Sequence, residues 1–338
     1  MNKVNAIGIK EEILKSFNSR NALVTGGTGM IGREVVGILS YAGANVKIVS
    51  LDKIRLNDKA EHIFGDLTDF NFCKEICKDM DFVFHLAGIQ GTAQTSKTKP
   101  ASHFVPNLMM NTNILEAARR NKVKKVVFTG SIGAYAEGEI FRESDYRYDT
   151  QPMDFAAWGK RMAELQIHAY KVQYNLDNFS IVIPSHVYGP GDNFDPETAL
   201  VIPSLMRKIY KKDNPVVVWG DGNAVRDFVF SRDVAQGAAQ AIYYGTKSRI
   251  VNLGSGNGTS IRELVKTLNS FLDFNYKFDL TKPSGFPKRV MDISLARKLI
   301  GYNPETSLPE GLKQTWDWFV KNPDEHLKKK NYFKEDNG

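Results

Sequence analysis

The feature that most constrains this chain is a glycine-rich turn between a short apolar run and a stretch with helical spacing. Four consecutive segments make up the pattern: the apolar run Asn21–Thr25, the turn Gly26–Gly32, the helical stretch Arg33–Tyr41 and a second apolar run Asn45–Leu51. Glycines three residues apart let the chain turn tightly and bring backbone N–H groups to the start of a helix. The sequence therefore predicts a strand-turn-helix-strand unit with an anion site at the turn.

An acidic residue just after the second apolar run indicates which anion the turn would hold. Asp52 lies twenty residues after Gly32, where a carboxylate can accept hydrogen bonds from both hydroxyls of an adenosine ribose. That arrangement favours NAD(H), with its pyrophosphate at the glycine-rich turn. Lys53 and Arg55 follow Asp52 closely and could instead hold the 2′-phosphate of NADP, so this alternative stays open.

Further apolar runs extend this pattern into a sheet. They are separated from one another by helix-like stretches and cover Asp81–Leu86, Lys124–Phe128 and Phe179–Ile183. Right-handed crossovers would bring Thr25, His85 and Thr129 together at the carboxyl edge of the sheet, where ligands bind. We therefore predict an α/β fold with a Rossmann-like, doubly wound parallel sheet.

Length, composition and charge narrow the functional classes. A chain of 338 residues suits two packed lobes, and 42% hydrophobic with 25% charged residues is an ordinary globular composition. The formal charge of +7 comes mostly from scattered basic residues, with a run at Lys328–Lys330 that we expect to be a solvated end. This scatter argues against nucleic acid as a partner. The charge fits either an enzyme whose ligands carry phosphates or simple solubility.

Cysteine usage and hydropathy indicate the compartment. Cys73 and Cys77 lie one helical turn apart and predict no disulfide framework. No matching His or Cys cluster accompanies them, so we expect core thiols in a reducing cytoplasm and no metal site. The stretch Met1–Arg20 is polar and amphipathic, and no later run reaches membrane-spanning length, so we expect neither secretion nor membrane insertion.

Several short motifs accompany the glycine-rich turn. They are Gly65-Asp66-Leu67, His85-Leu86-Ala87-Gly88, Asn107 before Asn113-Ile-Leu-Glu-Ala-Ala, and Val187-Tyr188-Gly189-Pro190. Over nearly the whole chain this set resembles the extended short-chain dehydrogenases/reductases, the NAD-dependent nucleotide-sugar epimerase/dehydratase family. The resemblance implies an NAD-binding domain at 1–185 with a returning segment near 226–252, a smaller interleaved substrate lobe at 186–330 and a polar tail at 331–338.

The resemblance also implies which residues hold NAD(H). Asp66 and Leu67 would lie at the adenine. Ala87 would lie near the cofactor phosphates and ribose, and Asn107 beneath the catalytic group. The full set expected to contact the cofactor is Gly26, Thr28, Gly29, Met30, Ile31, Gly32, Asp52, Asp66, Leu67, Leu86, Ala87, Gly88, Asn107, Thr129, Lys160, Pro184 and Val187.

The family's catalytic positions fall on Ser131, Ala156 and Lys160. By resemblance, Ser131 would hydrogen-bond the reacting sugar oxygen. Lys160 matches the lysine of the family's Tyr-x-x-x-Lys pair, which binds nicotinamide ribose and lowers the pKa of the tyrosine by its charge. The tyrosine is absent, because Ala156 stands four residues before Lys160 and an alanine cannot move a proton.

No neighbouring aromatic residue replaces the missing tyrosine in register. Phe155 is one position away and lacks a hydroxyl, while Tyr135 and Tyr148 belong to other segments. Three explanations stay open: an engineered replacement of a native tyrosine, a natural enzyme that recruits another base, and a binding protein without catalysis. We favour the first, because the supporting residues are all present.

The second half of the chain resembles most closely the GDP-fucose synthase and GDP-sugar 4-oxidoreductase branch. The likeness lies in Asn193–Pro196, Val201–Pro203, Val217–Asn223, Arg226–Phe228 and Lys282–Lys288. Arg226 is the expected phosphate clamp, because a guanidinium fork matches phosphate oxygens. The residues expected to bind the substrate are Ser131, His186, Asn193, Val201, Arg207, Trp219, Gly220, Arg226 and Lys288. A core histidine at 186 and a packing role for Trp219 are the alternatives.

The resemblance argues against two of the reactions found in the family. The branch's epimerisation cysteine and histidine fall on Gly133 and Leu200, and neither can exchange a proton. The Asp-Glu pair of the 4,6-dehydratases falls on Ile132 and Gly133. What is left is hydride chemistry at C4 of the sugar. We therefore expect an NAD-dependent 4-dehydrogenase for a GDP-hexose or GDP-heptose of surface (capsule) polysaccharide assembly, inactivated by Ala156.

Other functions and an oligomeric state also follow from the resemblance. A nucleotide-sugar 4-epimerase and a 4-keto reductase stay open. From another class, a non-catalytic protein that binds NAD or a nucleotide sugar also stays open. The family pairs through the helices that contain Asn107–Asn121 and Ala156–Tyr174, so a homodimer is expected.

Overall fold

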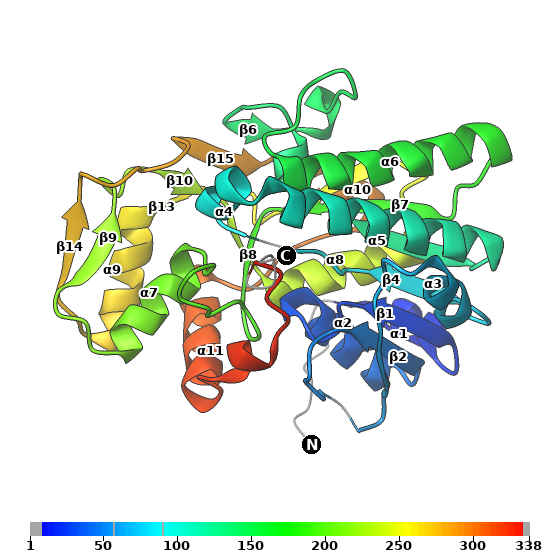
Figure 1. Cartoon of the computed structure of the whole chain (residues 1–338), viewed down its shortest axis with the longest axis horizontal. Coiled ribbons are helices and arrows are strands. Elements are labelled where there is room, and N and C mark those ends of the chain that lie inside the picture. The colour runs from blue at the N-terminus through cyan, green and yellow to red at the C-terminus, as the bar shows by residue number, and fades with distance from the viewer. Residues whose placement is uncertain (1–8, 57, 90, 334–338) are drawn as a thin grey trace.

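A computed structural model describes residues 9–56, 58–89 and 91–333. Its centre is a seven-stranded sheet in the order β12-β7-β5-β4-β1-β2-β3, with every neighbouring pair parallel (Figure 1). The strands are β1 (Asn21–Thr25), β2 (Asn45–Ser50), β3 (Glu61–Phe64), β4 (Phe82–His85), β5 (Lys125–Thr129), β7 (Phe179–Pro184) and β12 (Ile250–Leu253). The order runs outward from β1 in both directions, so the predicted doubly wound sheet is confirmed.

The predicted apolar runs became strands because both faces of this sheet are covered. β4 and β7 are buried along their whole length, and strands buried on both faces read as continuous apolar runs. The sequence pattern does not predict β3, which is an edge strand of mixed polarity with exposed ends. β12 comes from the second half of the chain and begins inside the returning segment expected near 226–252, although it ends one residue beyond it.

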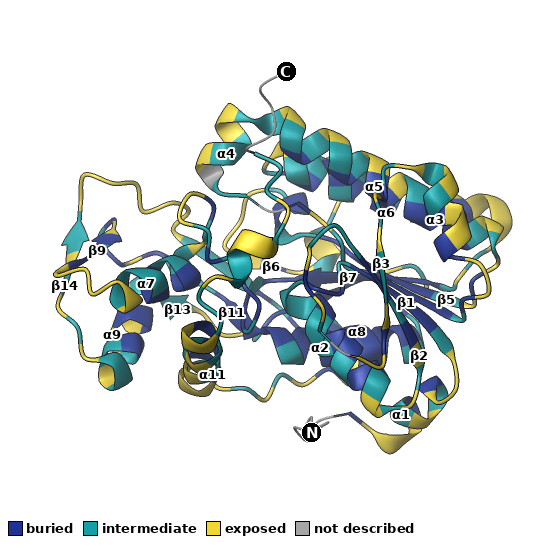
Figure 2. Ribbon diagram, turned by 60° about the horizontal axis from the view of Figure 1, so that its bottom comes forward, coloured by how far each residue is buried: buried dark blue, intermediate teal, exposed yellow. Residues whose placement is uncertain are grey.

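Two helical layers cover the faces of the sheet (Figures 1 and 2). One layer contains α3 (Phe70–Ile76), α5 (Pro100–Arg120) and α6 (Phe155–Tyr174), and α5 packs along α6. The other contains α1 (Glu11–Phe17), α2 (Met30–Tyr41) and α8 (Ser231–Tyr244), and α2 packs along α8. The short helix α4 (Ala93–Thr98) precedes α5, and α10 (Ser294–Ile300) packs against α8 and β12. No described helix is both long enough and apolar enough to span a membrane.

A smaller lobe surrounds a second hydrophobic core, which includes Met206, Leu264 and Leu312. Its helices are α7 (Val201–Tyr210), α9 (Ile261–Leu272) and α11 (Leu308–Lys321). Its strands are β6 (Ile140–Phe141), β8 (His186–Tyr188), β9 (Val216–Trp219), β10 (Val225–Arg226), β11 (Phe228–Phe230), β13 (Thr259–Ser260), β14 (Tyr276–Asp279) and β15 (Lys288–Met291). They pair as β13-β10-β15-β6, β11-β8 and β14-β9. Because α8, β12 and α10 return to the first core, the two lobes are interleaved.

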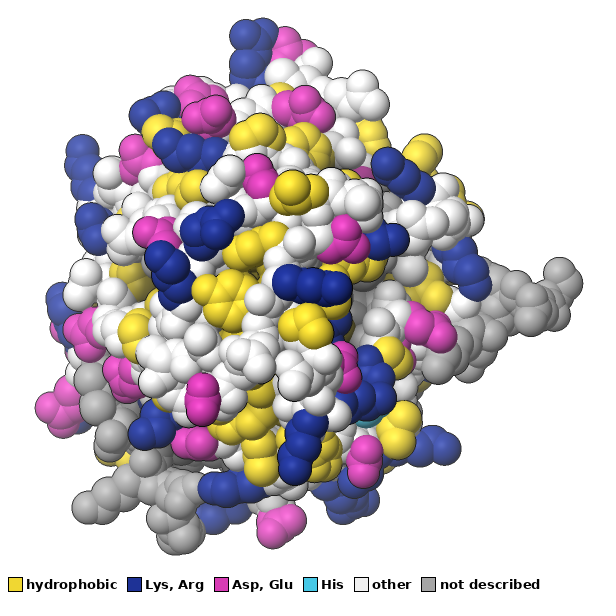
Figure 3. All heavy atoms as spheres, turned by 90° about the vertical axis from the view of Figure 1, so that its left-hand side faces the viewer, with side chains coloured by type: hydrophobic (Ala, Val, Ile, Leu, Met, Phe, Trp, Pro, Cys, Tyr) yellow, Lys and Arg dark blue, Asp and Glu magenta, His cyan; other side chains and the backbone are white. Residues whose placement is uncertain are grey.

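The distribution of charged side chains and the state of the two cysteines are as the sequence analysis expects. The face of the smaller lobe in Figure 3 shows Lys and Arg side chains scattered among acidic and hydrophobic ones. Cys73 and Cys77 are free thiols buried in the first core, as predicted, and burial raises the pKa of Cys73 to about 12.

The end of the chain differs from the expected polar tail. Three 3-10 helices occur in the described chain: η1 (Ile132–Ala134), η2 (Glu143–Asp145) and η3 (Glu325–Lys328). After η3, Tyr332 and Phe333 pack against the first core, and Lys329 donates hydrogen bonds to two backbone carbonyls. Lys328 and Lys330 are exposed as expected, whereas Lys329 is half-buried and the rings of Tyr332 and Phe333 are packed, so the solvated-tail expectation is wrong for these three residues. The rest of the expected tail, 334–338, lies outside the described residues.

A buried carboxylate joins the two lobes. Asp227 is fully buried between β10 and β11 and accepts hydrogen bonds from the N–H and hydroxyl of Ser255 (2.7 and 2.6 Å). It also accepts from the N–H groups of Gly256 (3.2 Å) and Met291 (3.1 Å). These donors offset the cost of burying the carboxylate, so the group holds the loop after β12 against β15.

Replacing Asp227 with asparagine should destabilise the fold. The side chain keeps its shape but turns an NH₂ group toward N–H donors, which leaves buried groups unpaired. We expect Asp227→Asn to lower the free energy of unfolding by about 2 to 4 kcal/mol, measured by urea denaturation. Asp317→Asn, on the exposed face of α11, is the control and should change it by less than about 0.5 kcal/mol. Equal stability of the two variants would contradict the role of Asp227.

A buried histidine connects the central strands to α5. His85 Nδ1 lies 2.7 Å from Thr25 Oγ1, and Nε2 lies 2.9 Å from Asn111 Oδ1. Burial, and then the charge of Lys160, lower the pKa of His85 to about 3. The ring is therefore neutral in the folded protein at neutral pH.

This histidine should make the fold sensitive to acid. Its folded pKa lies below its unfolded value, so the stability it contributes is complete above pH ~6.5 and is lost as pH falls toward about 3. Between pH 7 and pH 5 the wild-type chain should lose about 2 kcal/mol more unfolding free energy than His85→Gln, measured by urea denaturation at each pH. The exposed His168→Gln should keep the wild-type pH profile. Parallel profiles for wild type and His85→Gln would contradict this account.

Candidate active site

The glycine-rich turn is packed so closely that two of its positions require glycine. Gly26 has φ +66°, and a methyl group on it would lie 2.8 Å from Cα of Ala87. A methyl group on Gly32 would lie 2.2 Å from the carbonyl oxygen of Gly26. Only glycine fits at these two positions, so the turn packs against the end of β4. Gly29 caps α2, whose first N–H groups therefore face the carboxyl edge of the sheet, where an anion can bind.

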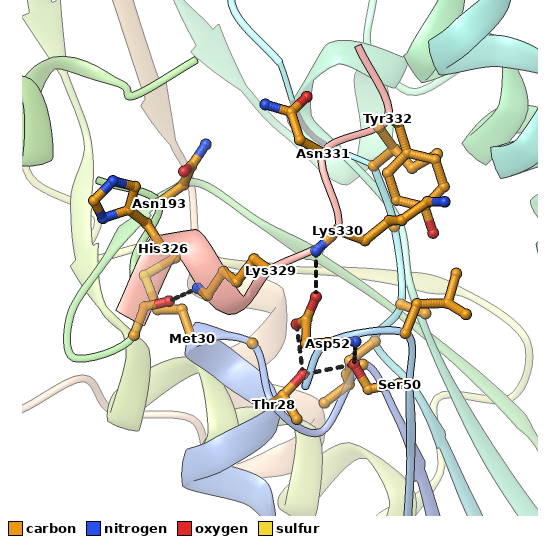
Figure 4. A pocket seen from close by; sticks show the side chains of 18 of the residues that line it. Thr28, Met30, Ser50, Asp52, Asn193, His326, Lys329, Lys330, Asn331 and Tyr332 are labelled. Atoms are coloured by element: carbon orange, nitrogen blue, oxygen red, sulfur yellow. Dashed lines mark hydrogen bonds between the residues drawn. The ribbon is translucent and has the colours of Figure 1, made fainter. Parts of the chain in front are cut away.

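Asp52 lies at the edge of the same pocket (Figure 4). Its Oδ2 accepts a hydrogen bond from Thr28 Oγ1 at 2.7 Å, and Thr28 Oγ1 lies 2.7 Å from Ser50 Oγ. Lys53 and Arg55 are exposed and are not part of the pocket lining. The geometry therefore offers a carboxylate for ribose hydroxyls, as NAD requires, rather than a cation for a 2′-phosphate.

Many residues predicted to hold the cofactor line this pocket. They are Gly26, Thr28, Gly29, Met30, Asp52, Leu67, Leu86, Ala87 and Gly88. Other predicted residues lie outside its wall: Ile31, Gly32, Asp66, Asn107, Thr129, Lys160, Pro184 and Val187. Their contact with the cofactor stays a prediction. Asp66 is nevertheless adjacent, because its neighbours Gly65 and Leu67 both line the pocket, while its own carboxylate accepts from the N–H of Thr68.

Lys160 and Asn107 meet beside Gly88. A methyl group on Gly88 would lie 3.3 Å from Lys160 Nζ and 3.6 Å from Asn107 Oδ1. Asn107 Oδ1 accepts from the N–H of Ile89 at 3.0 Å, which fixes its amide between α5 and the sheet. Lys160 Nζ donates to the carbonyl of Ala87 at 3.4 Å, and burial lowers the pKa of Lys160 to about 8. The ammonium group is thus held at the inner end of the cofactor pocket.

The other two catalytic positions lie close together. Ser131 follows β5 and caps η1, where its Oγ accepts from the N–H of Gly133 at 3.2 Å. A methyl group on Gly133 would lie 3.4 Å from Ser131 Oγ and 3.2 Å from Cβ of Ala157, so η1 packs on the first turn of α6. Ala156 is in that turn, and Lys160 lies one turn further along the same face. The three predicted positions therefore converge, with a methyl group where the family has a phenol.

The tyrosines considered as replacements do not reach this place. Tyr135 is 2% exposed, and its hydroxyl donates to Asn252 Oδ1 at 2.8 Å. Tyr148 packs against the rings of Tyr146 and His168. Neither hydroxyl is placed to act beside Ser131.

Two arginines lie side by side on neighbouring strands of the smaller lobe. Arg226 and Arg289 are direct partners in the parallel pair β10–β15. Arg226 donates to the carbonyls of Val225 and Phe286, and the guanidinium of Arg289 lies 3.7 Å from the centre of the Phe286 ring. Burial, and then Arg226, lower the pKa of Arg289 to about 10. Neither guanidinium forms a salt bridge with a described carboxylate, and Asp154 and Glu137 act on Arg289 only through their charge. Such a pair of guanidinium groups can accept an anionic ligand.

The sequence prediction named Lys288, and the structure adds Arg289 as the strand partner of Arg226, so a substrate contact of Lys288 stays a prediction. Successive side chains of a strand point to opposite faces, so the pairing of β15 with β10 aligns Arg289, and not Lys288, with Arg226 on one face. Because Lys288 and Arg289 are adjacent in a strand, the sequence could have indicated that only one of them lies on the same face as Arg226. It could not have indicated which one. His186 lies near the arginine pair, and burial, then Arg226 and Arg289, lower its pKa to about 3. A neutral imidazole is thus expected there.

The remaining predicted substrate residues are spread along the smaller lobe. Asn193 lines the cofactor pocket and donates to Thr198 Oγ1 at 2.8 Å. Val201 and Arg207 are on α7. Trp219 is 59% exposed at the end of β9, so the packing alternative is wrong for it, and Gly220 follows in a left-handed turn.

Pocket residues that the sequence analysis missed come from three places. The ends of β2 and β4 add Val49, Ser50, Leu51 and Ile89, and α5 adds Met110. The loop after β8 adds Gly191, Asp192, Asp195 and Thr198. The end of the chain adds His326, Lys329, Lys330, Asn331, Tyr332 and Phe333. The first group could have been found from strand position, whereas the last has no local sequence signal.

Comparison with known proteins agrees with this geometry. A model of the NAD dependent epimerase/dehydratase family matches residues 22–254. The chain is 32% identical to GDP-L-fucose synthase 1 of Arabidopsis thaliana over 318 residues, which covers 91% of this chain and 95% of the relative.

Solved structures extend the similarity to three dimensions. UDP-glucose 4-epimerase of Thermotoga maritima, solved with UDP-glucose, has a TM-score of 0.79 and 27% identity over 90% of this chain and 99% of its own. MoeE5, solved with UDP-glucose and NAD, has a TM-score of 0.77 and 25% identity, also over 90% of this chain and 99% of its own. The chain therefore belongs to the NAD dependent epimerase/dehydratase family of extended short-chain dehydrogenases/reductases, and its cofactor is NAD.

Proposed function

We propose that this chain binds a nucleotide diphosphate sugar and is built for NAD-dependent oxidoreduction at C4 of that sugar. The observation that carries the proposal is the convergence of Ser131, position 156 and Lys160 beside the NAD pocket. A GDP-hexose or GDP-heptose is the substrate that we propose, in surface polysaccharide synthesis in the cytoplasm. The 32% identity to a GDP-L-fucose synthase supports the guanine nucleotide.

The chain's residues divide the work of this reaction. Ser131 Oγ would donate a hydrogen bond to the C4 oxygen, and the Lys160 ammonium would hold nicotinamide ribose and stabilise a phenolate. NAD supplies the acceptor for the C4 hydride when bound. A tyrosine at position 156 would take the hydroxyl proton as the ketone forms. Because Ala156 takes no proton, binding should persist while turnover is lower by about two to four orders of magnitude.

Two side chains limit the reaction to C4. Gly133 packs against α6 and has no side chain, and Leu200 stands at the N-cap of α7 with an aliphatic side chain, so neither residue can exchange a proton at C3 or C5. A 4-epimerase or a 4-keto reductase uses the same residues, so these two are the nearest alternatives within the family. The similarity to UDP-glucose 4-epimerase supports keeping the first.

Ala156 is the observation that favours a second candidate function, a non-catalytic protein that binds NAD or a nucleotide sugar. A protein that senses NAD or a nucleotide sugar needs the glycine-rich turn, Asp52 and the two arginines but no proton acceptor. We propose the enzyme first, because Ser131 and Lys160 keep the spacing that the family uses around its catalytic tyrosine, although both residues could also contact a ligand in a sensor. An engineered replacement of tyrosine would reconcile their presence with Ala156.

A homodimer through α5 and α6 is part of the proposal. Val105 and Met109, one turn apart on α5, are 47% and 44% exposed, and Val172 on α6 is 74% exposed. Exposed apolar residues on two adjacent helices support a protein contact at this face.

Restoring the phenol tests the proposed reaction. Ala156→Tyr should raise the rate of NADH formation by about two to four orders of magnitude with a GDP-hexose or GDP-heptose, followed by absorbance across a panel of GDP- and UDP-sugars. Ala156→Phe is the matched control, because it adds the ring without the hydroxyl and should leave the rate unchanged. If neither variant nor the wild-type chain turns over any sugar in either direction while all three bind one, the sensor is the better description.

The arginine pair should hold the diphosphate. Arg289→Gln and Arg226→Gln should each weaken GDP binding by about 10- to 100-fold in calorimetric titrations, because each loses a charge-assisted contact. Lys288→Gln changes the neighbouring cation, which points to the other face, and should alter GDP binding by less than about twofold. A larger effect at position 288 than at position 289 would reverse the assignment.

A further inference from the structure

The described end of the chain crosses the mouth of the NAD pocket. We call the segment Glu325–Phe333 the C-terminal strap. Six residues of the strap line the pocket: His326, Lys329, Lys330, Asn331, Tyr332 and Phe333. Figure 4 shows Lys329 and Lys330 passing beside Thr28 and Asp52. The strap is therefore one wall of the cavity in which the adenosine and diphosphate of NAD are expected.

The strap is tied to the protein at its beginning. Glu325 forms a salt bridge with Arg33 of α2 at 2.5 Å, and both side chains are nearly buried, 13% and 12% exposed. The carbonyl of Lys328 accepts from the N–H of Lys53 at 3.0 Å. An ion pair shielded from water is stronger than an exposed one, so the strap starts from a fixed point beside the glycine-rich turn.

The far end of the strap is tied to the opposite side of the pocket. The ring of Phe333 lies 4.6 Å from that of His103 on α5, and the carbonyl of Phe333 accepts from Lys99 Nζ. Because its two ends are attached on different sides, the segment between them must pass over the cavity.

Asp52 has room for both the strap and a ribose. The N–H of Lys330 donates to Asp52 Oδ1 at 3.0 Å, and Thr28 donates to Oδ2. Each carboxylate oxygen has two lone pairs, so each can still accept a ribose hydroxyl. The cavity also persists with the strap in place, since residues of the strap and of the glycine-rich turn line it together. These observations indicate that the strap forms a wall of the NAD pocket and does not occupy the position of the ribose.

Lys329 brings a cation to this wall. Its Nζ donates to the carbonyls of Gly191 at 2.5 Å and Asp192 at 3.4 Å, and it forms no salt bridge with a described carboxylate. A methyl group on Gly191 would lie 2.1 Å from Arg33 Nε, so Lys329 and Arg33 meet at the same loop. Arg33 Nη2 donates to the carbonyl of Thr28, within the glycine-rich turn. The two cations are thus next to the expected pyrophosphate position.

We propose that the C-terminal strap is part of the NAD site, in which it encloses the adenosine diphosphate half of the cofactor and Lys329 binds the diphosphate. The inference rests on the NAD cofactor and not on the identity of the sugar. The inference is therefore tested by the binding of NADH and its fragments, and this binding does not require a tyrosine at position 156.

Ligand fragments distinguish contact with the diphosphate from general loosening of the pocket. Lys329→Met should weaken binding of NADH and ADP-ribose by about tenfold or more, measured by fluorescence and calorimetry, and should leave adenosine binding unchanged. Lys328→Met is the matched control, because Lys328 is the exposed neighbour on the same segment. Equal loss for adenosine and ADP-ribose, or no loss for either, would overturn the role of Lys329.

Release of the cofactor tests the enclosing wall. A chain that ends at Asp324 should release NADH at least about tenfold faster in stopped-flow fluorescence, because nothing covers the pocket mouth. Glu325→Gln in the full chain removes the salt bridge to Arg33 and should also make NADH release faster. This second variant tests the proposal even if the shortened chain does not fold. Unchanged or slower release, or tighter NADH binding in either variant, would show that the strap competes with the cofactor and overturn the proposal.

Discussion

The close approach of the first turn to the end of β4 is the constraint on which the cofactor site depends. Gly26 has a left-handed backbone and leaves no space for a side chain against Ala87, and Gly32 leaves none against Gly26. Contact this close fixes the start of α2 relative to both strands. The anion-binding end of α2, the carboxylate of Asp52 and the ammonium of Lys160 are consequently held in one rigid frame.

The substrate side is attached to this frame by chain segments that return from the smaller lobe. Asp227 accepts hydrogen bonds from the loop after β12, which is in the large sheet, and from β15, which carries Arg289. The neighbouring Arg226 is thereby placed next to Arg289. Because one buried carboxylate joins β15 and the loop after β12, the strand that carries Arg289 and the large sheet are expected to move together.

The site keeps ligand binding and proton transfer on different residues. In the proposed function, ligand binding would depend on the glycine-rich turn, Asp52 and the arginine pair, all of which are present in this chain. The proposed proton transfer would need a tyrosine in the first turn of α6, where this chain has Ala156, while Ser131 and Lys160 are both present. A chain with this division can hold a substrate unreacted, which is why its binding and its turnover must be measured separately.

The sequence alone determined the features that depend on neighbouring residues. β1, the glycine-rich turn, α2 and β2 follow from local periodicity and from glycines at fixed spacing, and Asp52 follows from its distance to the turn. The positions of Ser131, Ala156 and Lys160 came from motifs of a recognisable family, and the structure brings them together. The pattern could not predict β3, because a short edge strand of mixed polarity lacks an apolar face.

Only the tertiary structure decided which of several chemically similar residues face the site. Lys288 and Arg289 are adjacent cations, and it is the pairing of β15 with β10 that turns Arg289 toward Arg226. Lys329 belongs to a polar segment without periodicity, and it reaches the pocket because Glu325 meets Arg33, 292 residues earlier in the chain. Such contacts join residues far apart in sequence, so no local pattern encodes them, whereas spacing within a turn or a strand is fixed by the backbone itself.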